Sequence, residues 1–250
     1  MKRGPGSLYR RGETIRFALS RDRDAIKAFL LDGEIDLRTR IGLLARVLHA
    51  TNHLRGYHSN AEMIRVGRAI LQRPGAVVVE AGCGYGGSTA KLSSFVGAAG
   101  GVLHVFDSFR GMPANAETDH HMDGRPVRFF PGAFRGRLSA VRRAVEHFGN
   151  IQVCRFHKGW FSETLSTFQQ PVDVVLLDVD LVSSTRTCIR YLYPLMKRTG
   201  VMFSQDGHLR GVAELLKSRV FWSNEVGCGP PTIDGLGIHK LISWRRQNEE

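Results

Sequence analysis

Residues 77–87 read VVVEAGCGYGG, a short run of valines that ends in Glu80 and passes into a glycine-rich turn. The β-branched run predicts a buried strand, and residues 88–92 predict the start of a helix. Gly82 and Gly84 permit positive φ and leave room where a ligand lies against the backbone. Free amides at the helix start suit an anionic group. The stretch therefore predicts a strand–turn–helix unit that holds a nucleotide-like ligand.

Glu80 helps to decide which ligand that is. The spacing Gly82-x-Gly84-x-x-Gly87 occurs in sites for NAD, FAD and S-adenosylmethionine alike. A carboxylate directly before the glycines would repel a pyrophosphate, but it suits the cationic amino-acid end of S-adenosylmethionine, directly or through water. We therefore favour a methyl donor over a dinucleotide. A plain turn without a ligand stays an alternative.

Strands and helices alternate regularly from residue 76 onward. Strands are expected at 77–80, 102–107, 151–156, 172–178 and 200–205, followed by two more at 225–228 and 237–244. This order predicts an α/β fold with a doubly wound, Rossmann-like, seven-stranded sheet whose last strand is antiparallel. Residues 1–60 are expected to form an arm and a helical cap before a main domain at 61–250. Such a cap could close a pocket or form the face of a homodimer.

The composition excludes several classes of protein. A chain of 250 residues with 42% hydrophobic content can bury the core of one α/β domain. The sequence contains no run of 18 apolar residues, so no membrane span is expected. The four cysteines lack the spacing of a zinc site, which favours free thiols and a cytoplasmic location. The net charge of +12 could indicate nucleic acid or an anionic small-molecule acceptor. Because the basic residues are scattered and not interleaved with aromatic ones, nucleic acid is not expected.

Acidic residues stand at the ends of four predicted strands. They are Glu80, Asp107, Asp178 with Asp180, and Asp206, and in a doubly wound sheet they share one edge. Asp107 lies 20 residues after Gly87, where an acid takes the ribose hydroxyls of an adenosine. Asp178 and Asp206 could hold a hard cation through oxygen ligands, which would lower the pKa of a substrate hydroxyl.

A long irregular segment interrupts the alternation. Residues 108–134 contain Pro113, Pro126, Pro131 and the pair His120-His121, and they leave the carboxyl end of the second strand. Loops of this length in compact domains are usually functional or disordered. This segment therefore predicts a functional loop at the edge of the sheet where ligands bind.

Ordered blocks of the sequence resemble the macrocin O-methyltransferase (TylF/MycF) family. The blocks are Val78-Val79-Glu80-x-Gly82, residues 106–113 (FDSFRGMP), residues 159–165 (GWFSETL), residues 178–185 (DVDLVSST), residues 192–195 (LYPL) and the acid Asp206. The resemblance implies an enzyme that methylates a hydroxyl, in particular a sugar hydroxyl, of a small natural product such as an antibiotic precursor. It also implies S-adenosylmethionine as the methyl donor and, usually, Mg²⁺.

The residues and the resemblance together give a candidate site. The residues expected at the cofactor are Glu80, Gly82, Gly84, Tyr85, Ser88, Asp107, Ser108, Phe109, Gly159, Trp160 and Asp178. The resemblance implies a base at His121 or His120, with His208 as a second candidate. It also implies a metal at Asp178 and Asp206.

The chain departs from the family at the fifth strand end. Gln205-Asp206 stands where two adjacent acids are usual, so Gln205 would offer a neutral oxygen and Mg²⁺ would bind more weakly. A metal-free enzyme that relies on histidine is an alternative. Two other functions stay open at this point: an NAD-dependent oxidoreductase, and a non-catalytic protein that binds nucleotides or RNA.

Overall fold

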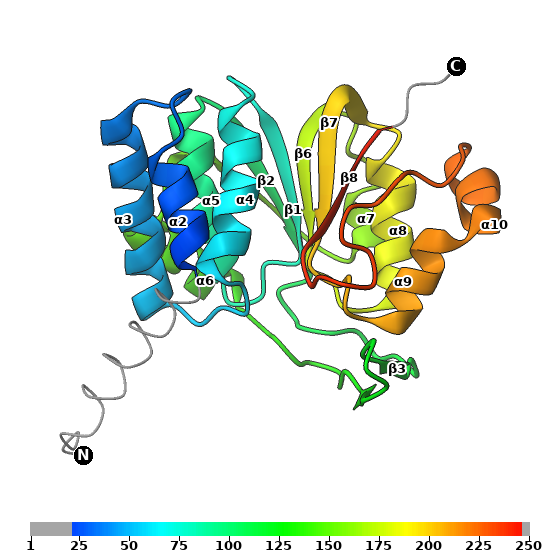
Figure 1. Ribbon diagram of the computed structural model, residues 1–250. Helices are drawn as coiled ribbons and strands as arrows, with labels where there is room; N and C mark the ends of the chain where they lie inside the picture. The colour runs from blue at the N-terminus through cyan, green and yellow to red at the C-terminus, as the bar shows by residue number, and fades with distance from the viewer. Residues whose placement is uncertain (1–21, 247–250) are drawn as a thin grey trace, which may run out of the picture.

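The computed structural model describes residues 22–246, which form a three-layer α/β/α domain (Figure 1). Residues 1–21, where the N-terminal arm is expected, lie outside the described residues. The central sheet has the strand order β5-β2-β1-β6-β7-β8. Its strands are β1 (Val77–Ala81), β2 (Val102–Asp107), β5 (Cys154–Lys158), β6 (Val172–Leu177), β7 (Met196–Ser204) and β8 (Ile242–Arg245).

The sheet is parallel except for β8, which pairs antiparallel with β7. The predicted fold class is confirmed, but the sheet has six strands within residues 22–246 and the expected number of seven is not reached. The strand expected at 225–228 is absent there because the chain stays in the helical layer. Trp222 is fully buried, donates its indole N–H to the carbonyl of Leu216 at 2.7 Å and begins the π-helical turn Trp222–Val226.

Helices cover both faces of the sheet (Figure 1). One layer contains α2 (Arg23–Leu30), α3 (Leu37–His53), α4 (Asn60–Leu71), α5 (Gly87–Ala98) and α6 (Leu138–Phe148). The other contains α7 (Phe161–Thr164), α8 (Val182–Leu192), α9 (Arg210–Lys217) and α10 (Arg219–Phe221). No helix of the described chain is long and apolar enough to cross a membrane.

Alternate residues of each strand supply the two cores. Val78 and Leu176 pack with the first helical layer, whereas Val79 and Leu177 pack with the second. This follows from the two-residue period of a strand, which turns successive side chains to opposite faces. Phe29 of α2 belongs to the first core, so the N-terminal helices pack into the same core as the sheet.

The segment between β2 and α6 is irregular, as expected for residues 108–134. Its regular pairing is the short hairpin of β3 (Asp119–His120) and β4 (Pro126–Val127). Figure 1 shows this loop below the carboxyl ends of the strands. The loop base is closed because Met112 N–H bonds to the carbonyl of Ala133 at 2.9 Å and Gly132 N–H bonds to that of Met112 at 2.9 Å.

Candidate active site

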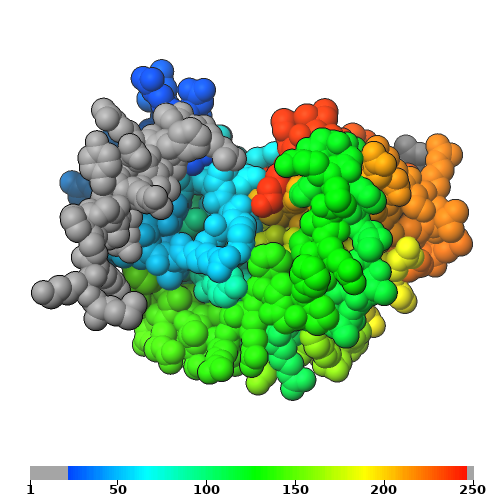
Figure 2. Space-filling model, turned by 90° about the horizontal axis from the view of Figure 1, so that it is seen from below, coloured from blue at the N-terminus to red at the C-terminus, as the bar shows by residue number. Residues whose placement is uncertain are grey.

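A cavity of about 220 Å³ opens at the carboxyl edge of the sheet. Its wall comes from the glycine turn, residues 55–58, the 108–134 loop, the turns after β5 and β6, His208 and Lys240. Figure 2 views this face, where the segment before α4, the 108–134 loop and the chain before β8 surround the hollow. Parallel α/β sheets bind ligands at this edge.

Backbone contacts fix the glycine turn on one side of the cavity. Gly82 has φ +84°, and a Cβ there would lie 2.0 Å from the carbonyl oxygen of Asp178. A Cβ on Gly87 would lie 2.6 Å from the carbonyl oxygen of Arg55. Both distances are too short for any side chain. The turn can therefore approach its two neighbouring segments only because these positions are glycine.

Asp107 ties this turn to the loop that follows β2. Its Oδ2 accepts hydrogen bonds from the backbone N–H groups of Cys83 at 2.8 Å and Gly84 at 3.3 Å, and its Oδ1 accepts one from Phe109 N–H at 2.6 Å. Asp107 also lines the cavity. One carboxylate thus orders two loops at the place where a nucleoside was expected.

Glu80 lies beneath the turn rather than in the cavity wall formed by the described residues. The hydroxyl of Thr89 donates to its Oε2 at 2.6 Å, and its Oε1 has no hydrogen-bond partner among residues 22–246. Burial raises the pKa of Glu80 to about 7, although hydrogen bonds from Ser88 and Thr89 oppose the shift. The carboxyl group therefore titrates near neutral pH.

Most of the residues expected at the cofactor meet around the cavity. Those that line it are Gly82, Gly84, Tyr85, Ser88, Asp107, Ser108, Gly159, Trp160 and Asp178. Glu80 does not line it, and Phe109, which has φ +54°, is buried in the first core. The structure thus brings nine of the expected residues to one cavity and places these two behind its wall.

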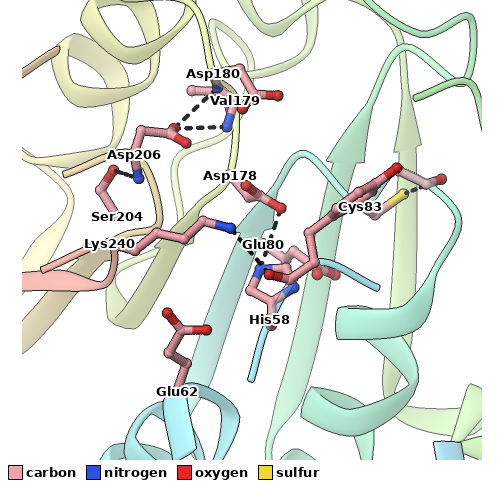
Figure 3. A network of polar contacts seen from close by, with 12 residues as sticks. His58, Glu62, Glu80, Cys83, Asp178, Val179, Asp180, Ser204, Asp206 and Lys240 are labelled. Atoms are coloured by element: carbon pink, nitrogen blue, oxygen red, sulfur yellow. Dashed lines mark hydrogen bonds and ion pairs between the residues drawn. The ribbon is translucent and has the colours of Figure 1, made fainter. Parts of the chain in front are cut away.

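Three carboxylates meet at the turn after β6 (Figure 3): Asp178 and Asp180 line the cavity, whereas Asp206 is fully buried and does not line it. Asp178, Asp180 and Asp206 each offer an oxygen within 4.8 Å of the others. Asp206 lies just after β7 and accepts the backbone N–H groups of Val179 and Asp180, both at 3.1 Å. Asp180 has φ +59°, an uncommon value for a residue other than glycine. These contacts fold the turn after β6 around Asp206.

Burial and the neighbouring negative charges raise the pKa values of two of these three carboxyl groups. Burial, followed by the charges of Asp206 and Asp178, raises the pKa of Asp180 to about 9. Burial and Asp178 raise the pKa of Asp206 to about 7. Crowded carboxylates of this kind bind a proton or a cation. Because all three donors are hard oxygens, the cluster fits a divalent cation such as Mg²⁺.

Gln205, the other residue expected at the metal, lies directly after β7. It is fully buried, it does not line the cavity, and neither its amide nitrogen nor its amide oxygen has a hydrogen-bond partner in the described part of the chain. The carboxylate that joins Asp178 and Asp206 is Asp180, which the sequence analysis placed at the strand end but did not expect as a ligand. Its positive φ, which brings it to the cluster, has no signal in the sequence.

Two side chains beside the carboxylate cluster come from segments far apart in the sequence and were not expected from it. His58 Nε2 lies 3.3 Å from Asp178 Oδ2, and Lys240 donates a hydrogen bond from Nζ to the carbonyl of Tyr57 at 3.1 Å. Figure 3 shows the Lys240 amine pointing toward Asp178 and His58. Burial opposes ionisation of Asp178, but His58 and then Lys240 outweigh it and lower the pKa of Asp178. The capping motif of Ser59 and Glu62 could have placed His58 at a helix start, but nothing local indicates its partner.

Two of the three candidate histidines face the cavity. The rings of His121 and His208 stack with their centroids 5.2 Å apart, and both residues line the cavity. His120 is exposed and does not line it. Burial, Lys240 and His121 lower the pKa of His208. A neutral imidazole at this position can accept a proton.

Comparisons with known proteins agree with this geometry. The model of the family described as macrocin-O-methyltransferase (TylF) matches residues 58–220. No curated protein sequence matches the chain.

Solved structures of methyltransferases share the fold. The O-methyltransferase NovP superposes with a TM-score of 0.60 at 21% identity, over 76% of this chain and 81% of that one. The calicheamicin methyltransferase CalS11 superposes with a TM-score of 0.60 at 15% identity, over 99% of this chain and 95% of that one. The Podospora anserina methyltransferase PaMTH1, bound to S-adenosylhomocysteine, superposes with a TM-score of 0.54 at 12% identity, over 82% of this chain and 88% of that one. At these identities the likenesses show the fold alone.

Proposed function

We propose that this chain, which belongs to the macrocin O-methyltransferase (TylF) family and so transfers a methyl group from S-adenosylmethionine to oxygen, acts on a sugar hydroxyl of a small natural product. Family membership confirms the resemblance noted in the sequence, and it removes the oxidoreductase alternative. The fold neighbour CalS11 is described as a TDP-rhamnose 3′-O-methyltransferase of calicheamicin biosynthesis. That description supports a sugar as the acceptor here.

The observation that carries the proposal is the convergence of two different half-sites on one cavity. The glycine turn and Asp107 form the donor half, where we place the cofactor. The acceptor half consists of the carboxylate cluster and the two stacked histidines. This arrangement supports a hydroxyl held between the methyl donor and a base.

We propose that His121 or His208 takes the proton of the acceptor hydroxyl. The oxygen then forms a bond to the methyl carbon as the carbon–sulfur bond of the sulfonium breaks. His58 and Lys240 hold Asp178 ionised and in place beside this oxygen. The carboxylates of Asp178, Asp180 and Asp206 would hold Mg²⁺, which supplies a positive charge that favours the deprotonated hydroxyl.

We also extend the proposal to the N-terminal region and its setting. Residues 55–58 line the cavity, which supports a role in closing it for the expected cap at residues 1–60. All four cysteines are free thiols, which supports the expected cytoplasmic location. We propose that the cap also forms the face of a homodimer, and sedimentation of the intact protein at the mass of a single chain would contradict this.

Methyl transfer to nucleotide-linked sugars and to glycosylated natural products tests the proposal. Each acceptor is incubated with S-adenosylmethionine, and S-adenosylhomocysteine release is followed by mass spectrometry. We expect at least one sugar acceptor to gain a single methyl group on oxygen, and EDTA to slow the reaction. Turnover confined to non-sugar acceptors, such as catechols, would contradict the sugar assignment. Full activity in EDTA would contradict the role given to the metal.

A further inference from the structure

Two helices beside the carboxylate cluster lack cap side chains of their own. The residues before α8 and α9 are Leu181 and Leu209, and leucine offers no acceptor for the free N–H groups of a helix start. Both leucines are buried in the core. The residue before each helix therefore contributes to the core and not to capping. The first N–H groups of each helix need an acceptor from another segment.

Acidic residues of the 108–134 loop supply that acceptor. The carboxylate of Glu117 accepts the N–H of Val182 at 2.8 Å and that of Ser183 at 3.3 Å, in the first turn of α8. Asp119 accepts the N–H of Gly211 at 2.9 Å, in the first turn of α9. One loop thus caps both helices, and these helices directly follow the turns that carry Asp180 and Asp206.

Gly211 leaves the space that Asp119 occupies. A Cβ at this position would lie 2.9 Å from Oδ2 of Asp119 and 2.8 Å from Cγ2 of Val182. Gly211 lies in a helix and has no positive φ, so backbone conformation does not require glycine there. The close fit between the loop and α9 is the reason that the structure shows for glycine at this position.

The same contacts set the position of His121. Beyond Asp119, Met122 N–H bonds to the carbonyl of His208 at 3.0 Å, and His121 forms an isolated bridge with Leu209. The His121 ring thereby reaches its stacked position on His208 at the cavity. If the two acids released the helices, the loop would keep its closed base at Met112 and Ala133 and the backbone bond from Met122, but it would lose the side-chain anchors that precede His121.

We infer that Glu117 and Asp119 are positioning residues, which clamp the 112–132 loop onto α8 and α9 and hold His121 at the cavity. The catalytic part of this inference rests on the proposed methyl transfer, whereas the docking of the loop does not. Because the clamp joins the loop to the helices that follow the carboxylate cluster, it also sets the position of His121 relative to that cluster.

Limited proteolysis and kinetics of the intact protein test the clamp. The double variant Glu117→Ala/Asp119→Ala should be cut by trypsin after the exposed Arg128 about tenfold faster than the wild type or more, since two caps are lost. Its kcat should fall by a similar factor, while its Kd for S-adenosylhomocysteine changes less than about threefold because the donor half keeps its contacts. Glu117→Gln/Asp119→Asn keeps neutral acceptors and should recover much of kcat.

Asp36→Ala provides the matched control. Asp36 caps α3 by accepting Thr39 N–H at 2.9 Å, away from the loop. This variant should lose thermal stability but keep the wild-type cleavage rate and kcat. Gly211→Ala should reproduce the faster cleavage without removing either acid, so it also decides the matter if the double variant does not fold.

The outcomes separate the clamp from the proposed function. Cleavage and kcat of the loop variants equal to those of Asp36→Ala would overturn the inference. Faster cleavage with unchanged kcat would confirm docking and overturn the positioning of His121. If the wild type methylates no acceptor, the proposed function fails, and the cleavage rates still decide whether the acids dock the loop.

Discussion

The donor and acceptor halves of the cavity are built in different ways. The donor half comes from the contiguous stretch 77–109 and depends on backbone geometry, with glycines that admit no Cβ and amides that bond to Asp107. The acceptor half comes from side chains far apart in the sequence, including His58, Asp178 and Lys240. A local pattern of residue types can encode the first half. The second exists only once the sheet has brought its strand ends together.

Gly82→Ala should have the largest effect, because it adds a side chain at the closest contact between the donor half and its neighbouring backbone. A Cβ would meet the carbonyl oxygen of Asp178 at 2.0 Å, and φ is +84°. We expect S-adenosylhomocysteine affinity to fall at least about 100-fold and thermal stability to fall by several kcal/mol, as the left-handed backbone alone costs about 1–2 kcal/mol. Calorimetry and thermal unfolding measure the two effects.

Gly100→Ala is the control for that experiment. Gly100 also has positive φ, +67°, but no heavy atom of the described chain lies within 4 Å of its added Cβ. It should show the backbone cost alone and bind the cofactor product normally. Equal effects of the two substitutions would mean that the contact with Asp178 does not shape the donor half.

Asp178→Asn tests the acceptor half and should rank second. It removes the charge that faces His58, Lys240 and the other two carboxylates. We expect kcat to fall about 100-fold, as for the loss of one preorganised electrostatic contact, and Mn²⁺ affinity measured by calorimetry to weaken. S-adenosylhomocysteine should still bind if the two halves act separately.

Asp173→Asn is the matched control at the other end of the same strand. Asp173 pairs with Lys197 at 2.8 Å and accepts Val77 N–H at 2.9 Å, away from the cavity. Its loss should lower thermal stability and leave kcat nearly unchanged. A comparable loss of kcat in both variants would show that Asp178 acts through stability alone.

Glu80→Gln should produce a moderate effect that depends on pH. Burial raises the pKa of Glu80 to about 7 in the folded protein, above its value in the unfolded chain. The folded state therefore binds the proton more tightly, and the stability that this proton provides is present at low pH and lost as pH rises through about 7. Glutamine keeps an acceptor for Thr89 but does not titrate.

The difference in melting temperature between Glu80→Gln and the wild type, both without ligand, should therefore grow in favour of the variant from pH 5 to pH 8. A shift of roughly 2–3 pKa units corresponds to about 3 kcal/mol, or roughly 6–12 °C for a domain of this size. A difference that stays constant across this range would show that Glu80 keeps an ordinary pKa in the folded protein.

Gln205→Met should have the smallest effect. It removes two buried polar atoms that have no partner in residues 22–246, at nearly constant volume. We expect thermal stability to stay level or rise slightly, and Mn²⁺ affinity to stay within about twofold. A tenfold loss of affinity would instead show that Gln205 is a metal ligand, as the family comparison of the sequence suggested.

The contrast between the two halves explains which parts of the fold and the site could be predicted from the sequence. The alternation of strands and helices and the glycine turn follow from residue patterns with short periods, so the fold class and most donor-side residues were predicted. The strand expected at 225–228 was wrong because the burial of Trp222 is a tertiary effect. Asp180 was missed as a cluster member because backbone conformation at one residue decides it, and His58 because its partner lies 120 positions away.

The hydrogen bond from Lys240 to Tyr57 also bears on the order in which the two halves form. It closes a separation of 183 residues, whereas the bond from Cys83 N–H to Asp107 closes one of 24. By loop-closure entropy alone, the longer closure costs about 2 kcal/mol more, unless intervening structure has already formed. The donor half can thus fold early and locally. We expect the acceptor half to be completed later, when the segment before β8 brings Lys240 to Tyr57, because this contact closes the longer separation.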